Sequence, residues 1–172
     1  TKKALENAAR VVAATGGSTN AALHLPAIAH EAGFKFDLFD VCEIFRSTPL
    51  IADMKPGGKY VAKDLFEVGG VQVVMRALLD GGFLHGDCLT VTGKTIKDNL
   101  RGVELPKGQN VVYSAKNPIS RTGGVVGLKG NLAPEGAVVK IAGLKKLQFT
   151  GPARVFDSEE EAFAAVVNKK YK

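Results

Sequence analysis

The chain has 172 residues, 45% of them hydrophobic and 23% charged, a composition that excludes a disordered protein. Its net charge of +6 comes from lysines and arginines scattered over residues 101–172, without an RNA-binding or zinc-finger motif, so we expect no nucleic-acid partner. No apolar stretch is long enough to span a bilayer, and the two cysteines, Cys42 and Cys88, lack CxxC spacing, so we expect a cytoplasmic protein with no membrane partner.

The first two predicted helices are joined by a glycine turn. Apolar residues at helical spacing predict a helix over 2–14, and the chain opens inside this pattern, as expected for a piece cut from a longer protein. The glycines of GGSTN, 16–20, favour a sharp turn, because glycine readily adopts positive φ. A second helix is expected from about 19 to 32; it is apolar on almost all sides, so we expect it to be buried and kinked at Pro26.

Ser18, Thr19 and Asn20 permit two interpretations. Their side-chain oxygens can cap the second helix by accepting its first N–H groups, which is the common use of these residue types. Free N–H groups beside hydroxyls at a buried helix start can also bind a carboxylate or a phosphate. The local pattern leaves both interpretations open.

Helical and extended patterns alternate through the rest of the first hundred residues, which predicts an α/β layered fold. Asp37 begins a short helix that Pro49 stops, and Gly69-Gly70 interrupts a helical region. The expected elements are that region at about 63–79, short strands at 49–54 and 88–93, a glycine turn at 55–60, and a short helix at 95–102.

A second, β-rich domain is expected to start near residues 103–110, where the pattern changes. Short apolar runs separated by Gly, Pro and Asn predict strands at 111–113, 124–128, 137–141 and 147–149. The segment 156–167 predicts a helix capped by Asp157 or Ser158, with acidic residues in its first turn.

One local motif suggests a nucleotide site. TVTGKT, 90–95, has the order of strand, Gly-Lys-Thr and helix found in phosphate-binding loops, but Cys88 stands where the loop requires its first glycine. A free-standing nucleotide-binding module using Val91–Thr95 is therefore an alternative with little support. None of the three histidines has the spacing of a metal ligand set, and no Ser-His-Asp or Cys-His arrangement can be recognised.

Five longer blocks carry a family resemblance. They are GGSTNAALHLPAIAHEAG, TPLIADMKPGGKYVAKDLFEVGG, GGFLHGDCLTVTGKT, NPISRTGGVVGLKGNLAPEGAVVK and GPARVFDSEEEA. In this order they are spread over residues 16–162 and closely resemble the dihydroxy-acid dehydratases, in the wider family that includes phosphogluconate and sugar-acid dehydratases. One departure is MKPGGKY, where many relatives have serine in place of Gly57 or Gly58.

The resemblance implies a fold and an activity. Residues 1–105 would be the C-terminal part of an α/β cluster-binding, catalytic domain, and residues 106–172 the start of a β-rich, barrel-like domain similar to the aconitase swivel domain. The enzyme would be a hydro-lyase that converts 2,3-dihydroxy-3-methyl carboxylic acids to 2-oxo acids in valine, isoleucine and leucine biosynthesis. A phosphogluconate or sugar-acid dehydratase of the same family is the alternative.

The resemblance also implies cofactors that this chain does not hold. The full-length enzyme would use an iron–sulfur cluster, [2Fe–2S] or [4Fe–4S], together with Mg²⁺, and is expected to be a homodimer. The family's cluster cysteines, magnesium ligands and serine base belong to motifs outside the five blocks. Three thiolates are needed for such a cluster, and Cys42 and Cys88 match no cluster motif. We therefore expect no catalytic or metal-binding residue in this chain, which should be inactive alone.

What the resemblance assigns to this chain is substrate binding. Ser18, Thr19 and Asn20 would face the catalytic cavity between domains and hold either the substrate carboxylate or the surroundings of the cluster. Lys55, His85 and Lys94 are secondary candidates for the same site. A role as a structural or interaction module, for example in a dimer interface, is the remaining alternative.

Overall fold

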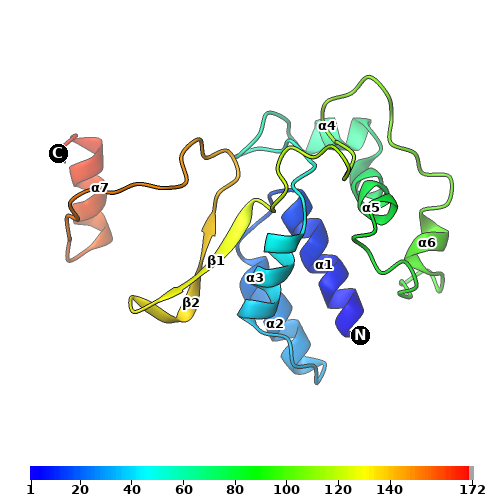
Figure 1. The fold of residues 1–172 in the computed structure, drawn as a ribbon, viewed down its shortest axis with the longest axis horizontal. Helices are drawn as coiled ribbons and strands as arrows, with labels where there is room; N and C mark the ends of the chain where they lie inside the picture. Colours follow the sequence, from blue (N-terminus) through cyan, green and yellow to red (C-terminus); the bar gives the residue numbers. More distant parts are fainter. Residues whose placement is uncertain (171–172) are drawn as a thin grey trace.

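The structure, a computed structural model, describes residues 1–170 and contains both helices and strands (Figure 1). Most predicted helices are confirmed, including the separation of two helices at Gly69-Gly70. In chain order the elements are α1 (Lys2–Ala14), α2 (Ala21–Glu31), α3 (Leu38–Ser47), α4 (Ala62–Glu67), α5 (Gly70–Asp80), α6 (Ile96–Asn99), β1 (Val125–Gly130), β2 (Ala133–Lys140) and α7 (Glu159–Val167).

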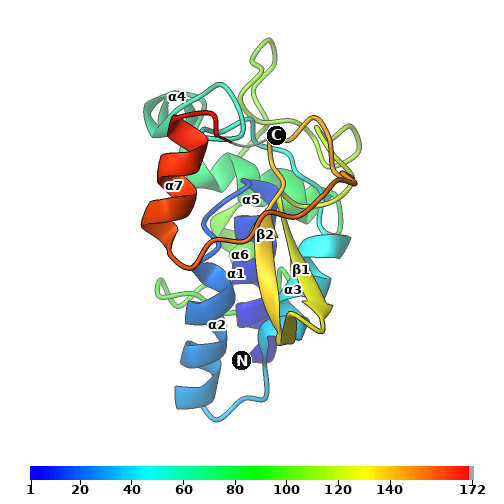
Figure 2. The ribbon, with the colours of Figure 1, turned by 90° about the vertical axis from the view of Figure 1, so that its left-hand side faces the viewer.

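The first core lies between α1, α2, α3 and the start of β1. Alanines on the facing sides of α1 and α2, such as Ala13 and Ala29, are fully buried and let the helices pack closely. Val41 and Phe45 of α3 fill the space between them, and Val125 of β1 closes the cluster. The β1–β2 hairpin is thus anchored on helices that are distant from it in the chain, and it lies beside α3 in both ribbon views (Figures 1 and 2).

A second core joins α5 to two extended segments. Val74 and Leu78 of α5 are fully buried against Ile51, which follows α3, and Val112, which precedes the hairpin. Ala14, at the end of α1, also belongs to this cluster, and its carbonyl accepts hydrogen bonds from the N–H groups of Ile51 and Ala52. The end of α1 therefore lies between both cores.

The expectation that the second helix is buried is wrong. Ala22, Leu25 and Ala29 of α2 are buried, but Leu23 is 70% exposed and Ile28 is 56% exposed. The reason is that α2 packs only on α1 and α3, so that one stripe faces the core, and no other described element covers its outer face.

Three predicted strands form only isolated bridges. Segment 49–54 pairs through Leu50 with Ser120 and through Ala52 with Val112, so the expected strand at 111–113 also contributes a single pair. Segment 88–93 forms a turn closed by a bridge between Leu89 and Thr95. Segments 49–54 and 111–113 meet their partners at single residues, so no ladder follows. Residues 147–149 are likewise not a strand.

The described sheet is one antiparallel hairpin, in which Val125 lies opposite Lys140 and Gly127 opposite Val138. Together with the helices it gives a protein of mixed helices and strands. This confirms the predicted α/β class as far as the two kinds of element are concerned. Within residues 1–170, the β content expected after residue 103 is limited to this hairpin.

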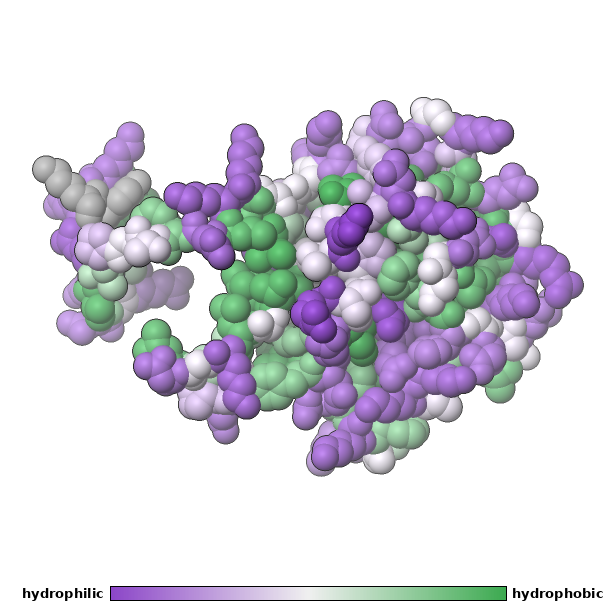
Figure 3. Space-filling model, viewed as in Figure 1, coloured by the Kyte–Doolittle hydropathy of each residue, from purple (hydrophilic) through white to green (hydrophobic). Residues whose placement is uncertain are grey.

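The helix α7 stands apart from the rest of the molecule, beyond the segment 145–157 (Figure 1). Ser158 caps it by accepting a hydrogen bond from the Glu161 N–H at 3.2 Å, as one of the two predicted caps. Apolar side chains gather on the side of the body that faces α7 (Figure 3). Exposed apolar residues of the β1–β2 turn, the 145–157 segment and α7 include Leu132, Leu147, Phe149, Val155 and Phe163. Among residues 1–170, no helix has both the length and the apolar character needed to cross a membrane.

Candidate functional site

A cavity of about 340 Å³ lies where four distant parts of the chain meet. Its walls come from Thr15 and Gly16 after α1, from 50–58 after α3, from 119–124 before β1, and from 141–147 after β2. Backbone hydrogen bonds hold these parts together, because the N–H of Leu50 donates to the Ser120 carbonyl at 3.0 Å and the N–H of Ile141 donates to the Gly124 carbonyl at 2.8 Å. Three of the five sequence blocks thus contribute to one cavity.

Glycines allow the cavity walls to approach through their backbones. A Cβ atom placed on Gly57 would lie 2.7 Å from the Ala142 carbonyl oxygen, and one on Gly143 would lie 2.6 Å from the Gly57 oxygen. A Cβ on Gly124 would lie 2.8 Å from the Cα of Gly16. Side chains do not fit at such distances, so Gly57 lets the 55–60 turn pack directly on the loop after β2. A serine at this position requires the two loops to separate.

The polar groups of the cavity are hydroxyls and one carboxylate. Ser120 Oγ accepts a hydrogen bond from the Thr122 N–H at 3.3 Å and lies 3.4 Å from Thr122 Oγ1. Asp53 lines the opposite wall, and its carbonyl accepts from the N–H groups of Lys59 and Tyr60. A few convergent polar groups in a mostly apolar cavity are typical of a site for a small polar molecule. The sequence prediction missed Asp53, Ser120 and Thr122, although the blocks that contain them were recognised.

Ser18, Thr19 and Asn20 lie beside this cavity and do not line it in the structure. Ser18 and Asn20 are exposed and Thr19 is half-buried. Ser18 Oγ accepts a hydrogen bond from the Asn20 N–H at 3.2 Å, which stabilises the turn. Asn20 occupies the N-cap position of α2, but its side chain does not bond a helix N–H, so the predicted side-chain cap is wrong.

The α2 N–H groups find backbone partners instead, because the N–H groups of Ala21 and Ala22 donate to the Ser18 and Thr19 carbonyls at 3.2 and 3.0 Å. Within residues 1–170, the Thr19 hydroxyl and the Asn20 amide make no side-chain hydrogen bond. These two groups are therefore available to a ligand at the edge of the cavity.

Of the secondary candidates, only Lys55 is close to the cavity. It is exposed between Met54 and Gly57, which line the cavity, and its N–H donates to the Tyr60 carbonyl at 2.8 Å. Lys55 is joined to Pro56 by a cis peptide bond.

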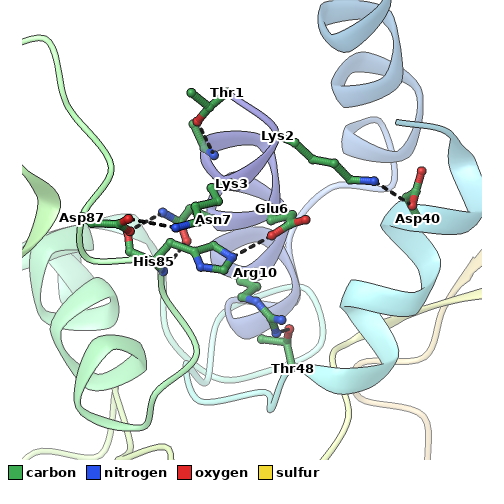
Figure 4. A network of polar contacts seen from close by, with 11 residues as sticks. Thr1, Lys2, Lys3, Glu6, Asn7, Arg10, Asp40, Thr48, His85 and Asp87 are labelled. Atoms are coloured by element: carbon green, nitrogen blue, oxygen red, sulfur yellow. Dashed lines mark hydrogen bonds and ion pairs between the residues drawn. The ribbon is translucent and has the colours of Figure 1, made fainter. Parts of the chain in front are cut away.

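His85 lies in a different place, on the outer side of α1 (Figure 4). Its Nε2 is 2.6 Å from Glu6 Oε2, and its backbone N–H and carbonyl both bond the side chain of Asn7, at 2.8 and 3.0 Å. Lys3 Nζ lies 2.8 Å from Asp87 Oδ2; this contact raises the pKa of the Lys3 ammonium and lowers the pKa of the Asp87 carboxyl. His85 is thus part of a link between α1 and the 84–88 segment, remote from the cavity.

Lys94 lies in an exposed turn that does not form a phosphate-binding loop. Its carbonyl accepts hydrogen bonds from the N–H and the hydroxyl of Thr90, both at 2.9 Å. Asn99 donates to the Thr90 hydroxyl at 2.7 Å, so the polar groups of the turn bond one another. The helix that follows, α6, has 4 residues. The structure does not support a nucleotide site at Val91–Thr95.

Cys42 and Cys88 lie in separate parts of the structure. Cys42 is half-buried on α3 and faces Gly127, and burial raises the pKa of its thiol, with a smaller contribution from Asp37. Cys88 is buried with Ile96 and Leu100. Among residues 1–170, no three His, Cys, Asp or Glu side chains come together as a metal site. The described residues therefore do not fit an iron–sulfur cluster. We assign no reaction step to a metal held by these residues.

Two family models together match most of the chain. The model described as dihydroxy-acid/6-phosphogluconate dehydratase N-terminal matches residues 1–99, and the corresponding C-terminal model matches residues 110–172. A protein named dihydroxy-acid dehydratase 2 from Bradyrhizobium diazoefficiens is 70% identical over the whole chain, which covers 30% of that relative. Its namesake from Mesorhizobium japonicum is 69% identical, with 29% of its length covered, and a dihydroxy-acid dehydratase from Parvibaculum lavamentivorans is 66% identical, with 30% covered. The chain spans about a third of the length of these relatives.

Proposed function

Because the chain belongs to the dihydroxy-acid/6-phosphogluconate dehydratase family, we propose that it is one segment of a hydro-lyase that removes water from a 2,3-dihydroxy carboxylic acid. The observation that carries the proposal is the single cavity formed by family-like blocks from distant parts of the chain. The full-length enzyme is the polypeptide that contains these 172 residues and has the proposed hydro-lyase activity.

The substrate we propose is a 2,3-dihydroxy-3-methyl carboxylic acid, which loses the C2 proton and the C3 hydroxyl as water. The resulting enol tautomerises to the 2-oxo acid of branched-chain amino acid biosynthesis. The relatives named above are all dihydroxy-acid dehydratases, which favours this substrate over 6-phosphogluconate. The alternative family substrates are phosphogluconate and sugar acids.

The turn at 16–20 is the part of this chain that we assign to the substrate. The Thr19 hydroxyl, the Asn20 amide and the Ser18 hydroxyl can donate to a carboxylate, and they stand at the N-terminus of α2, where the helix dipole favours negative charge. The Ser120 and Thr122 hydroxyls, which line the cavity, can bond the hydroxyls of the acid. Lys55 remains a secondary candidate on the rim, whereas His85 and Lys94 are remote from this site.

The remaining features of the full-length enzyme are also proposals. An iron–sulfur cluster and Mg²⁺, held by other segments, would supply the Lewis acid that assists departure of the C3 hydroxyl. The division into a cluster-binding domain up to residue 105 and a second domain from 106 is supported by the gap between the two family matches. We further propose a cytoplasmic homodimer, which sedimentation of the full-length enzyme would test.

The experiment that tests the function is a substrate panel. We expect the full-length enzyme to form a 2-oxo acid from 2,3-dihydroxy-3-methylbutanoate with a kcat/KM at least ten times that for 6-phosphogluconate. A preference for 6-phosphogluconate would favour the alternative within the family. Activity towards neither acid, or tight binding of ATP in a titration, would contradict the proposal.

A further inference from the structure

We propose that Lys140 is a positioning residue for the substrate-binding turn at 16–20. This inference rests on the proposed function, because it takes that turn as the place where the substrate carboxylate binds. Its geometric basis is one contact across the fold: Lys140 Nζ donates a hydrogen bond to the Gly17 carbonyl at 3.1 Å, between residues 123 positions apart in the chain.

The turn has no other long-range hydrogen bond in the described structure. The N–H groups of Gly16 and Gly17 donate to the Ala13 and Val12 carbonyls, and the Asn20 N–H donates to Ser18 Oγ. These bonds are local and set the shape of the turn. The turn is held against the rest of the fold by the close packing of Gly16 on Gly124 and by the hydrogen bond that Lys140 donates to Gly17.

Lys140 is well placed for this role because its own backbone is fixed. It is the last residue of β2 and lies opposite Val125, which is fully buried in the first core. The next two residues, Ile141 and Ala142, donate their N–H groups to the Gly124 carbonyl and line the cavity. The lysine side chain therefore connects the end of the hairpin to the turn at 16–20.

The charge of Lys140 has no carboxylate partner in the part of the chain that the structure describes. The ammonium is half-buried, and none of the ion pairs within residues 1–170 includes it, in contrast to Lys2, Lys3 and Lys63. A half-buried ammonium is costly unless its N–H groups are bonded, and a hydrogen bond from a charged donor is stronger than one from a neutral donor. For Lys140 the Gly17 carbonyl is the hydrogen-bond partner of the ammonium, whereas the ammonium groups of Lys2, Lys3 and Lys63 have carboxylate partners.

The test compares two substitutions of Lys140 in the full-length enzyme. Lys140→Met removes the donor and keeps most of the volume, whereas Lys140→Arg keeps a charged donor. For Lys140→Met we expect the KM for 2,3-dihydroxy-3-methylbutanoate to rise about tenfold, with kcat changed by less than about threefold. Lys140→Arg should restore most of the loss. Lys107→Met, at an exposed lysine with no described polar partner, is the matched control and should behave as wild type.

A second measurement reports on the turn without activity. Hydrogen exchange of the Asn20 and Ala21 N–H groups should become about tenfold faster in Lys140→Met, while the N–H of Phe45 in α3 keeps its protection. The proposal is overturned if KM and exchange at the turn both stay at wild-type values, or if exchange rises equally in α3, because the lysine would then have only a general structural role. If the wild-type enzyme fails to dehydrate the acid, the proposed function fails, and exchange alone decides whether Lys140 holds the turn.

Discussion

Asn7 forms hydrogen bonds to the backbone of His85 through both ends of its side-chain amide. Its Nδ2 donates to the His85 carbonyl at 3.0 Å, and its Oδ1 accepts from the His85 N–H at 2.8 Å (Figure 4). Asn7 is only 4% exposed, so the pair is shielded from water. This contact fastens the segment after α5 to the side of α1, across 78 positions of sequence.

The Asn7 contact predicts a local loss of stability on substitution. Asn7→Ala leaves the His85 N–H without a partner and leaves its carbonyl with only the 3.4 Å hydrogen bond from the Cys88 N–H. We expect the free energy of opening of the 84–88 segment to fall by about 2 kcal/mol. Native-state hydrogen exchange of the His85 N–H measures this directly. Asn110→Ala, at an exposed asparagine, is the control. Unchanged exchange at His85 would show that the segment is held by other contacts.

The hairpin predicts a steric effect at Gly127. A Cβ there would overlap the side chain of Cys42, whereas a Cβ at Gly130 in the same strand would meet nothing within 4 Å. Gly127→Ala should therefore destabilise the protein by about 1–3 kcal/mol through overpacking, while Gly130→Ala should have little effect. Calorimetric melting of the two variants makes the comparison. Equal melting temperatures would mean that β1 does not lie against α3.

Cys42 predicts a pH dependence of chemical labelling. Burial, and secondarily Asp37, raises the pKa of its thiol, and only the thiolate reacts with a maleimide. A raised pKa leaves less thiolate at any given pH, so Cys42 should react more slowly near neutral pH than a model cysteine. Its rate should also continue to rise with pH after the model cysteine has reached its plateau, which lies more than about one pH unit above the ordinary thiol pKa of about 8.5. Site-resolved mass spectrometry measures both rates, and a plateau shared with the model would contradict the burial.

Asp37 predicts a capping effect at α3. Its Oδ1 accepts from the N–H groups of Phe39 and Asp40 at 2.8 and 3.0 Å, and Asp40 Oδ2 accepts from the Asp37 N–H at 2.9 Å. Asp37→Ala should reduce the free energy of unfolding by about 1 kcal/mol, visible as a lower urea midpoint. Asp157→Ala, at an exposed aspartate beside the α7 cap, should leave the midpoint unchanged. A similar shift for both variants would argue against a specific cap.

The helices were predictable because their signals are local. The helix start at Asp37 and the glycine break at Gly69-Gly70 depend on a few neighbouring residues, and the structure confirms both. Strands depend on a partner elsewhere in the chain, which a single sequence does not specify. Leu50 and Ala52 are extended as expected, yet their partners are single residues after position 110, so no ladder forms.

The candidate site was predictable only in part for a similar reason. The GGSTN turn has cap-forming residues in a short run, so it was recognised, but the structure shows that backbone carbonyls rather than the Asn20 side chain satisfy the first N–H groups of α2. Asp53, Ser120 and Lys140 have no local signal, because their importance comes from segments that meet in space. The position of His85, remote from the cavity, follows from its contact with Asn7, which no spacing rule predicts.

The central claim is that the turn beside the cavity binds the substrate of a dehydratase, and steady-state kinetics of Asn20→Ala in the full-length enzyme tests it most directly. We predict that kcat/KM for 2,3-dihydroxy-3-methylbutanoate falls at least tenfold in Asn20→Ala, while Asn117→Ala, at another exposed asparagine, retains the wild-type value. The same kcat/KM in wild type and Asn20→Ala would contradict the account, because the turn would then have no contact with the reacting acid.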